Sequence, residues 1–471
     1  MRSIAIASAM TFAAAVLVSA CQCNLPVPCA DSRECPAGQT CIGGSCQGPS
    51  GSGGNSGTGG SSGTGGAGGA GGCTGLQCQQ MTCAGGAKTT ISGKVYAPNG
   101  TLPLYNAVVY VPNTDVAPFT PGVSCDKCGA GLSGNPIVQT TSDAAGNFRL
   151  EDVPAGTNIP LVIQMGRWRR VVRIPTVTAC MNNAISDAQV TRLPRTKAEG
   201  DIPLMAIATG NADPFECLLR KIGIDDSEFT LPSGTGRVHF HRYNGRDMSP
   251  SAPAGSELVG SASNLMRYDV VMLPCEGSHM LKPAAHTQNI IDYTTAGGRV
   301  FATHFSYVWI EYAQAPFPTT ATWRGNSNAP DGTVYTLDTS FPKGSTFADW
   351  LQNVNATTTR GELPIFEPRR NVVSVNNAVA QRWFYSMAQS NVGHYTFNTP
   401  VASLLPDGGS PDQCGRVVFS DFHVSAAALS GMPTFPASCK TEELSAQEKA
   451  LAFMLFDLSA CVQRDELPPI N

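Results

Sequence analysis

Three short stretches of the sequence place reactive side chains directly after apolar runs. Cys275 and Glu276 follow YDVVMLP, His304 follows RVFAT, and His423 follows VVFSDF. Imidazole and carboxylate groups bind zinc and other divalent ions, and imidazole also exchanges protons near neutral pH. These residues therefore predict either a metal or ligand site or a pair of acid–base groups.

Other interpretations of these residues stay open. In one, His304 and His423 hydrogen-bond each other or the backbone in a crevice without function. In another they bind a divalent metal ion together with Glu276 and Asp421. Cys275 is a candidate nucleophile, but it is one of five cysteines in this part of the chain, and a disulfide would consume its thiol.

The elements around these residues indicate an α/β domain over 200–471. IPLMAIAT is an apolar run typical of a strand buried on both faces, and DPFECLLRKIG follows as a helix with Asp213 as N-cap. Further helices are expected over 283–296, 345–354 and 445–461. This alternation predicts a mainly parallel, flavodoxin-like sheet with helices on both faces. The three reactive stretches should then meet at the carboxyl edge of the sheet.

One stretch of this domain shows neither the helical nor the strand period of apolar residues. Residues 311–343 are rich in Pro, Thr, Gly and Asn, and they predict either a lid over the crevice or a surface excursion.

Residues 73–195 predict a β-sandwich. Short β-rich runs alternate with turn signals such as Asn99-Gly100, and no helical period appears. The run RWRRVVR, at 167–173, reads as a solvated edge strand or as a basic patch for acidic polysaccharide or lipid headgroups. Cys125 and Cys128 have the spacing of metal ligands, but six cysteines in this region favour three internal disulfides.

The N-terminal part has the composition of an exported protein. Residues 1–20 are typical of a signal peptide, 21–47 predict a small disulfide-rich knot, with zinc as the less favoured interpretation, and 48–72 form a flexible Gly-rich linker. The chain has 471 residues, 17 cysteines and a net charge of −4. This balance does not suggest nucleic acid as a partner. Without Cys21, sixteen cysteines remain, which allows eight disulfides.

Three resemblances to known families add expectations. The stretch LVSAC resembles the lipobox of bacterial lipoproteins, which implies that Cys21 is the lipidated N-terminus. Because Gln22 rather than Asp follows it, the resemblance implies the outer membrane or cell surface. An ordinary signal peptide followed by a disulfide cysteine is the alternative.

The stretches SGKVY, NAVVYV and TTSDAAGNFRLEDVPAG resemble the carboxypeptidase regulatory-like domain, a transthyretin-like sandwich.

The stretches YDVVMLPCEG, AGGRVFATHFS and GRVVFSDFHVS are similar to the class I glutamine amidotransferase-like fold, in particular its trehalose-utilisation branch. By this resemblance, His304 occupies the position of the nucleophilic cysteine and His423 that of the catalytic histidine. Ser425 stands where an acid is expected. The resemblance thus implies that the ancestral reaction is lost.

These features together predict a cell-surface lipoprotein with a non-catalytic amidotransferase-like domain that binds a ligand or partner. The expected partners are the membrane, through the lipid anchor, and a polysaccharide, a peptide or an envelope protein. No cofactor is expected apart from a possible divalent metal ion at His304 and His423. The alternative is an extracellular metal-dependent or acid–base hydrolase acting on glycans or amides, with Glu276 as a third site residue.

Overall fold

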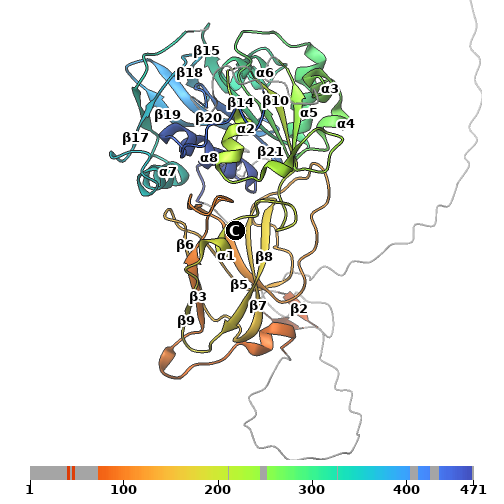
Figure 1. The fold of residues 1–471 in the computed structure, drawn as a ribbon, viewed down its shortest axis with the longest axis vertical. Helices are drawn as coiled ribbons and strands as arrows, with labels where there is room; N and C mark the ends of the chain where they lie inside the picture. The colour runs from red at the N-terminus through yellow and green to blue at the C-terminus, as the bar shows by residue number, and fades with distance from the viewer. Residues whose placement is uncertain are drawn as a thin grey trace, which may run out of the picture. The chain divides into compact units, whose positions relative to one another are not determined.

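The computed structural model describes most of the chain from residue 73 onward (Figure 1). The described residues are 40–42, 45–47, 73–210, 212–243, 252–325, 327–403, 412–424 and 434–468. The chain divides into two compact units, Met1–Ala70 and Gly71–Asn471. In the first unit, β1 (Thr40–Ile42) pairs antiparallel with β2 (Ser45–Gln47). The predicted signal peptide, Cys21, the rest of the knot and the 48–72 linker lie outside the described residues.

The second unit begins with the predicted β-sandwich. Its larger sheet has the order β5-β4-β7-β8, and its smaller sheet has the order β6-β3-β9. The strands are β3 (Thr90–Lys94), β4 (Val108–Pro112), β5 (Pro136–Thr141), β6 (Asn147–Leu150), β7 (Gly156–Met165), β8 (Trp168–Val177) and β9 (Asn182–Ala184). Short helical turns flank them: η2 (Gly75–Gln79), η3 (Ala84–Gly86) and α1 (Ala188–Thr191).

A ten-stranded sheet forms the centre of the α/β domain, in the order β11-β12-β10-β13-β14-β21-β20-β19-β16-β17. The first six strands are parallel, and the last four run antiparallel to their neighbours. The strands are β10 (Met205–Thr209), β11 (Phe229–Thr230), β12 (Val238–Arg242), β13 (Val270–Leu273), β14 (Arg299–Thr303), β16 (Thr333–Leu337), β17 (Glu362–Ile365), β19 (Ala380–Ser386), β20 (Asn391–Thr399) and β21 (Gly415–Ser420). The prediction of a sandwich followed by a mainly parallel α/β domain is confirmed.

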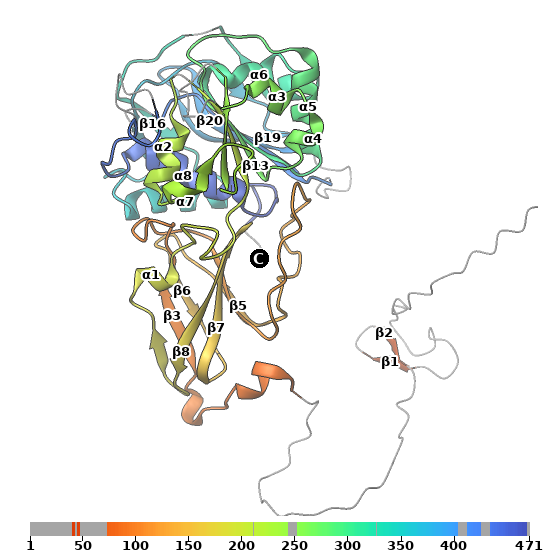
Figure 2. The same cartoon turned by 45° about the vertical axis from the view of Figure 1, so that its right-hand side comes forward.

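Helices cover both faces of this sheet, as the continuous apolar strands predict. On β13, Met272 packs in one core with α2, α7 and α8, while Val271 and Leu273 pack in another with α3 to α6. Figure 2 shows α3, α4 and α5 together on one side. The helices are α2 (Phe215–Lys221), α3 (Gly255–Val259), α4 (Ala262–Leu265), α5 (Ala284–Thr295), α6 (Val308–Glu311), α7 (Pro342–Asn353) and α8 (Ala446–Ser459), with the 3-10 turns η4 (Asp226–Glu228), η5 (His304–Tyr307) and η6 (Phe317–Thr320).

Local sequence signals account for several helix ends. Ser445 and Glu448 form the capping box of α8, and Gly297, at φ 120°, follows α5 as predicted. The N-cap of α2 is Pro214, so the prediction of Asp213 as N-cap is wrong. The reason is tertiary, because the Asp213 carboxylate bonds to Thr303 of β14 and to Val424 after β21. No helix among the described residues is long and apolar enough to cross a membrane.

The stretch 311–343 is an integral part of the domain rather than a surface excursion. It contains η6, β15 (Ala321–Trp323), β16 and the start of α7. β15 pairs with β18 (Val372–Val375), and β16 lies between β19 and β17 in the main sheet. Its strands pair antiparallel with partners far along the chain, so no period within the stretch revealed them.

Five disulfides stabilise the second unit, and two of them join the sandwich to the α/β domain. The five bonds are Cys73–Cys78, Cys83–Cys180, Cys125–Cys414, Cys128–Cys461 and Cys217–Cys439. The prediction of three internal sandwich disulfides is therefore wrong, and so is the metal interpretation of Cys125 and Cys128. Because Cys275 is free, the sixteen cysteines cannot form eight disulfides. The disulfides indicate an extracytoplasmic protein.

Two arginines of the run at 167–173 are buried, although a solvated strand was predicted there. Arg167 and Arg169 are only 9 % and 4 % exposed, so they do not form a solvated basic patch. Arg167 donates to Asp269 at the start of β13, at 2.8 Å. Arg169 pairs with Asp201 at 2.9 Å and lies over the ring of Phe119. β8 is an edge strand as predicted, but of the four arginines in the run only Arg173 is exposed, while Arg170 is half-buried.

Candidate metal centre

The three predicted reactive stretches follow three consecutive strands of the sheet. β13, β14 and β21 are neighbours and parallel, so their carboxyl ends meet at one edge. Cys275, His304 and His423 stand just beyond these ends and are 0 %, 2 % and 3 % exposed. The topological expectation that placed them together agrees with this geometry.

One sulfur and two nitrogens converge in this cluster. The Sγ of Cys275 lies 3.2 Å from the Nδ1 of His304, and the same Nδ1 lies 3.0 Å from the Nε2 of His423. All three atoms lie within 4.8 Å of one another. Among the described residues, this is the one group of three or more His, Cys, Asp or Glu side chains with such convergence.

The backbone at His304 turns sharply to aim the imidazole. Its φ is 36°, which non-glycine residues rarely adopt, and it opens the turn η5 directly after β14. Strained positions of this kind persist where the surrounding structure determines them, and they concentrate at functional sites. The turn directly after β14 therefore sets the direction of the His304 side chain.

Glu367 holds the other side of the His423 ring. Its Oε2 lies 3.2 Å from the Nδ1 of His423, and Gln447 donates to the His423 carbonyl at 2.7 Å. A histidine that donates its Nδ1 proton to a carboxylate keeps the Nε2 lone pair for a metal or a donor. The Glu367 side chain is 53 % exposed, so it links the buried cluster to solvent.

The charge state of His423 follows from these neighbours. Burial lowers the pKa of His423, but hydrogen bonds with Cys275 and Glu367 and the nearby Asp213 carboxylate outweigh it and raise the pKa to about 10. With no metal bound, the imidazole is therefore protonated at neutral pH. A metal ion would have to displace this proton.

Glu276, the fourth predicted site residue, has a different neighbour. It is buried and forms an ion pair with Lys282, whose ammonium also lies over the rings of Tyr243 and Trp309. Glu276 is not one of the three residues whose ligand atoms converge.

Asp421, considered with Glu276 as a metal ligand, is bound to the backbone. Its Oδ2 accepts the N–H groups of Asn371 and Val372 at 2.6 and 3.1 Å. Burial raises the pKa of Asp421 to about 7. Asp421 thus holds the loop that carries Glu367, and it supports the site through this loop rather than as a ligand.

The donor atoms of the cluster suit a transition-metal ion. Thiolate and imidazole are the preferred ligands of zinc and of softer ions such as Cu(I). Tetrahedral zinc, with bonds of about 2.3 Å to sulfur and 2.0–2.1 Å to nitrogen, separates such donors by about 3.4–3.6 Å. The separations of 3.0 and 3.2 Å differ from these by a few tenths of an ångström. Cys275, His304 and His423 therefore fit such an ion in donor type and in these two separations.

Cys275 supplies the free thiol that a cysteine-dependent reaction would need. The resemblance implied that no nucleophile accompanies the histidines, because His304 takes the place of the family's cysteine. Cys275 is free and lies beside His304, so the histidines do have a thiol within reach. Its sulfur also accepts the N–H of Gly277 at 3.4 Å.

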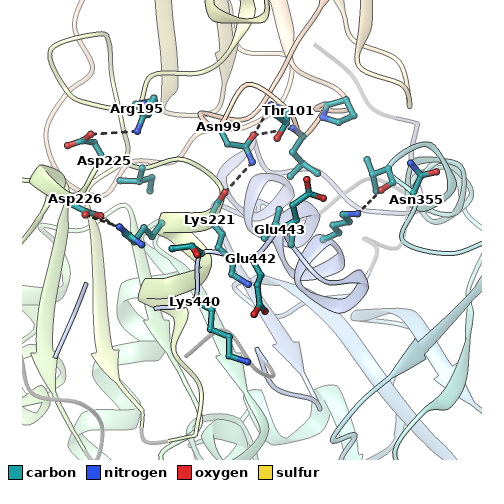
Figure 3. A pocket seen from close by; sticks show the side chains of 18 of the residues that line it. Asn99, Thr101, Arg195, Lys221, Asp225, Asp226, Asn355, Lys440, Glu442 and Glu443 are labelled. Atoms are coloured by element: carbon teal, nitrogen blue, oxygen red, sulfur yellow. Dashed lines mark hydrogen bonds and ion pairs between the residues drawn. The ribbon is translucent and has the colours of Figure 1, made fainter. Parts of the chain in front are cut away.

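A separate cavity of about 980 Å³ lies between the sandwich and the α/β domain (Figure 3). Many of its polar groups satisfy one another: Arg195 pairs with Asp225, and Asn99 donates to the Lys221 carbonyl at 3.2 Å. None of the predicted site residues lines this cavity.

Sequence reasoning missed two residues next to the cluster. Glu367 stands in a loop after β17 with no periodic pattern, so no signal marked it. Asp213 follows the buried strand β10, and the rule that selected the other strand ends would have selected it too.

No family model and no curated protein matches this sequence. Among solved structures, a putative ThuA-like protein from Bacteroides uniformis is 7 % identical, with a TM-score of 0.28 over 54 % of this chain and 89 % of that one. A cytoplasmic protein of Salmonella typhimurium, STM3548, is 12 % identical, with a TM-score of 0.27 over 48 % and 89 %.

A chain from a type II cohesin–X-dockerin complex of Acetivibrio cellulolyticus is 17 % identical, with a TM-score of 0.17 over 29 % of this chain and 85 % of that one. All three TM-scores are below 0.5, so these similarities carry no inference about function.

Proposed function

We propose that this chain is an exported lipoprotein whose α/β domain binds one transition-metal ion through Cys275, His304 and His423. The observation that supports this most is the convergence of one sulfur and two imidazole nitrogens within 4.8 Å, in a buried cluster. Zinc, or an ion with similar preference for nitrogen and sulfur, is the expected occupant.

The proposed role is binding rather than turnover. Three protein ligands leave one position of a tetrahedral ion for a small donor, and the ion would act on that donor as a Lewis acid. The cluster is at most 3 % exposed, so a polysaccharide or protein could not contact these side chains in this conformation. A carboxylate, an imidazole or a thiol of a small molecule is the ligand class that such a position takes.

Sequence features support the proposed location. LVSAC, with Cys21 as the lipidated residue, and the Gly-rich tract favour a tethered protein at the outer membrane or cell surface. The five disulfides of the described residues are consistent with an oxidising compartment. The membrane is the proposed partner at the anchor, and a polysaccharide, peptide or envelope protein remains the proposed partner elsewhere.

Elemental analysis of the exported protein, purified without chelators and then saturated with zinc, tests the proposal. We expect one equivalent of metal per chain, lost in Cys275→Ser and in His304→Ala/His423→Ala. His239→Gln/His241→Gln is the matched control, because it removes two buried histidines that share the Tyr268 hydroxyl and do not belong to the convergent cluster. A wild-type protein that binds less than about a tenth of an equivalent would overturn the proposal.

A second candidate is an enzyme with Cys275 as nucleophile. Two observations favour it: the Cys275 thiol is within hydrogen-bonding reach of a histidine, and His423 is oriented by Glu367. The thiolate would attack an amide or ester carbonyl, the leaving group would depart with the proton held by His423, and water would hydrolyse the thioester.

Alkylation separates the two candidates. If the cluster binds metal, one equivalent of zinc should slow the reaction of Cys275 with iodoacetamide by at least roughly tenfold, as measured by peptide mass mapping. Zinc-independent alkylation, together with amide or ester hydrolysis that Cys275→Ser abolishes, would instead establish the enzyme.

A further inference from the structure

Asp213 stands at the end of a fourth strand next to the cluster. β10 is the sheet neighbour of β13, and the order β10-β13-β14-β21 is parallel throughout. Four adjacent strands thus bring Asp213, Cys275, His304 and His423 to one edge. The Asp213 side chain is completely buried.

The carboxylate of Asp213 reaches the chain beside each proposed ligand. Its Oδ1 accepts the N–H of Val424, next to His423, at 2.6 Å. Its Oδ2 accepts the hydroxyl of Thr303, the residue before His304. The Thr303 oxygen in turn accepts the N–H of Cys275 at 3.0 Å. One carboxylate is therefore at most two hydrogen bonds from the backbone around all three ligands.

The loop that carries Asp213 packs closely against the backbone of Cys275. The N–H of Ala212 bonds to the Cys275 carbonyl at 3.2 Å, and a Cβ at Gly210 would clash with that carbonyl. These two backbone contacts hold the loop that carries Asp213 against the Cys275 backbone.

An ionised Asp213 would also oppose the charge of a bound ion. A divalent ion with one thiolate and two neutral imidazoles carries a net charge of +1 in a buried place, and such a charge is costly without a partner. A buried carboxylate that accepts two hydrogen bonds is well suited to offset it.

We propose that Asp213 is a positioning residue of the metal centre: by bonding to Val424 and Thr303, it sets the separation of the Cys275, His304 and His423 donor atoms and thereby the affinity for the ion. This inference rests on the proposed metal-binding function. Replacing outer partners of metal ligands typically lowers affinity roughly 10–100-fold.

The test compares Asp213→Asn with Asp269→Asn in the full-length protein. Asp269 is a matched control, because its buried carboxylate accepts one backbone N–H, from Leu204 at 2.6 Å, and one side-chain donor, Arg167 at 2.8 Å, but at the opposite ends of the strands. Zinc affinity is measured by competition with a chromophoric chelator. The ligand geometry is read from the visible absorption of the cobalt(II)-substituted protein.

We expect Asp213→Asn to weaken zinc binding roughly 10–100-fold and to shift the cobalt bands, whereas Asp269→Asn lowers only the unfolding midpoint. If the wild type binds metal and Asp213→Asn leaves both the affinity and the spectrum unchanged, this inference is wrong but the metal site stands. If the wild type binds none, the proposed function itself fails.

Should Asp213→Asn not fold, Thr303→Val provides the same test. It removes the hydroxyl that links Asp213 to the Cys275 backbone, at nearly constant volume, and Thr303→Ser, which keeps the hydroxyl, is its control. We expect the cobalt bands to shift in Thr303→Val and to stay in Thr303→Ser. Identical spectra in both variants would overturn the positioning role.

Discussion

The Nδ1 of His304 lies 3.0 Å from the Nε2 of His423, and the Sγ of Cys275 approaches that same Nδ1 from the next strand at 3.2 Å. An imidazole nitrogen offers one lone pair or one N–H, so it cannot serve two partners fully. A cation bound by all three atoms would use each lone pair once. The proposed metal centre would therefore replace the contact between the two histidines with one bond from each of them to the ion.

Glu367→Gln should weaken the metal centre without unfolding the protein. The carboxylate orients His423, so its loss should lower zinc affinity by roughly 10–100-fold, measured by chelator competition. The side chain is 53 % exposed, and the unfolding midpoint should hardly move. Glu362→Gln, an exposed residue of β17, is the control and should leave zinc affinity unchanged. Equal affinities in all three proteins would contradict an orienting role of Glu367.

Arg169→Glu should destabilise the protein strongly. The guanidinium is buried, pairs with Asp201 and donates to the Ala117 carbonyl at 2.9 Å. Reversing the charge leaves two carboxylates together, at a cost of about 3–5 kcal/mol in the free energy of unfolding. Arg173→Glu, on an exposed position of the same strand, should change it by less than about 0.5 kcal/mol. Urea unfolding measures both, and similar losses would refute the buried assignment of Arg169.

Cutting the chain between Lys197 and Ala198 should not release the sandwich. Both residues are exposed, so an inserted protease site there should be accessible. The disulfides Cys125–Cys414 and Cys128–Cys461 should hold the fragments together, giving one band on a non-reducing gel and two after reduction. The variant Cys125→Ser/Cys128→Ser should give two bands under both conditions. Two bands from the cut protein before reduction would show that these bonds do not form.

The stability of the protein should fall with acid through buried histidines. Burial lowers the pKa of His239 from 6.5 to about 4, so the unfolded chain binds this proton more readily than the folded protein does. Stability tied to His239 is thus complete above pH 6.5 and is lost as the pH falls to about 4, by at most about 3 kcal/mol. His239→Gln should lose less stability over this window, as measured by urea unfolding at several pH values. If the unfolding free energies of the wild type and His239→Gln fell equally between pH 6.5 and about 4, the lowered pKa of His239 would be contradicted.

Much of the fold follows from local signals in the sequence. The apolar runs before Cys275, His304 and His423 are strands β13, β14 and β21, and the capping box at Ser445 marks the start of α8. The rule that parallel strands present their carboxyl ends at one edge was sufficient to place the three side chains together. Whether they act as a site remains a prediction.

The remaining features depend on contacts that no local pattern encodes. Strand alternation predicts that Arg167 and Arg169 lie on one face. It does not reveal that Asp269 and Asp201 of the α/β domain, and Phe119 of the sandwich, contact them. The pairing of Cys125 and Cys128 is fixed by where Cys414 and Cys461 come to lie. Glu367 reaches His423 from the antiparallel half of the sheet, where long-range pairing, not periodicity, forms the strands.

The described chain contains eleven cysteines from residue 73 onward, and all but one of them are oxidised in pairs. Maturation must therefore discriminate among thiols, since an oxidant that reached Cys275 first would trap it with a wrong partner. Cys414 stands directly before β21 and Cys461 shortly after α8, so their two bonds tie both ends of the segment that bears His423 to the sandwich loop. An ion loaded early would act as a protecting group for the one sulfur that must stay reduced.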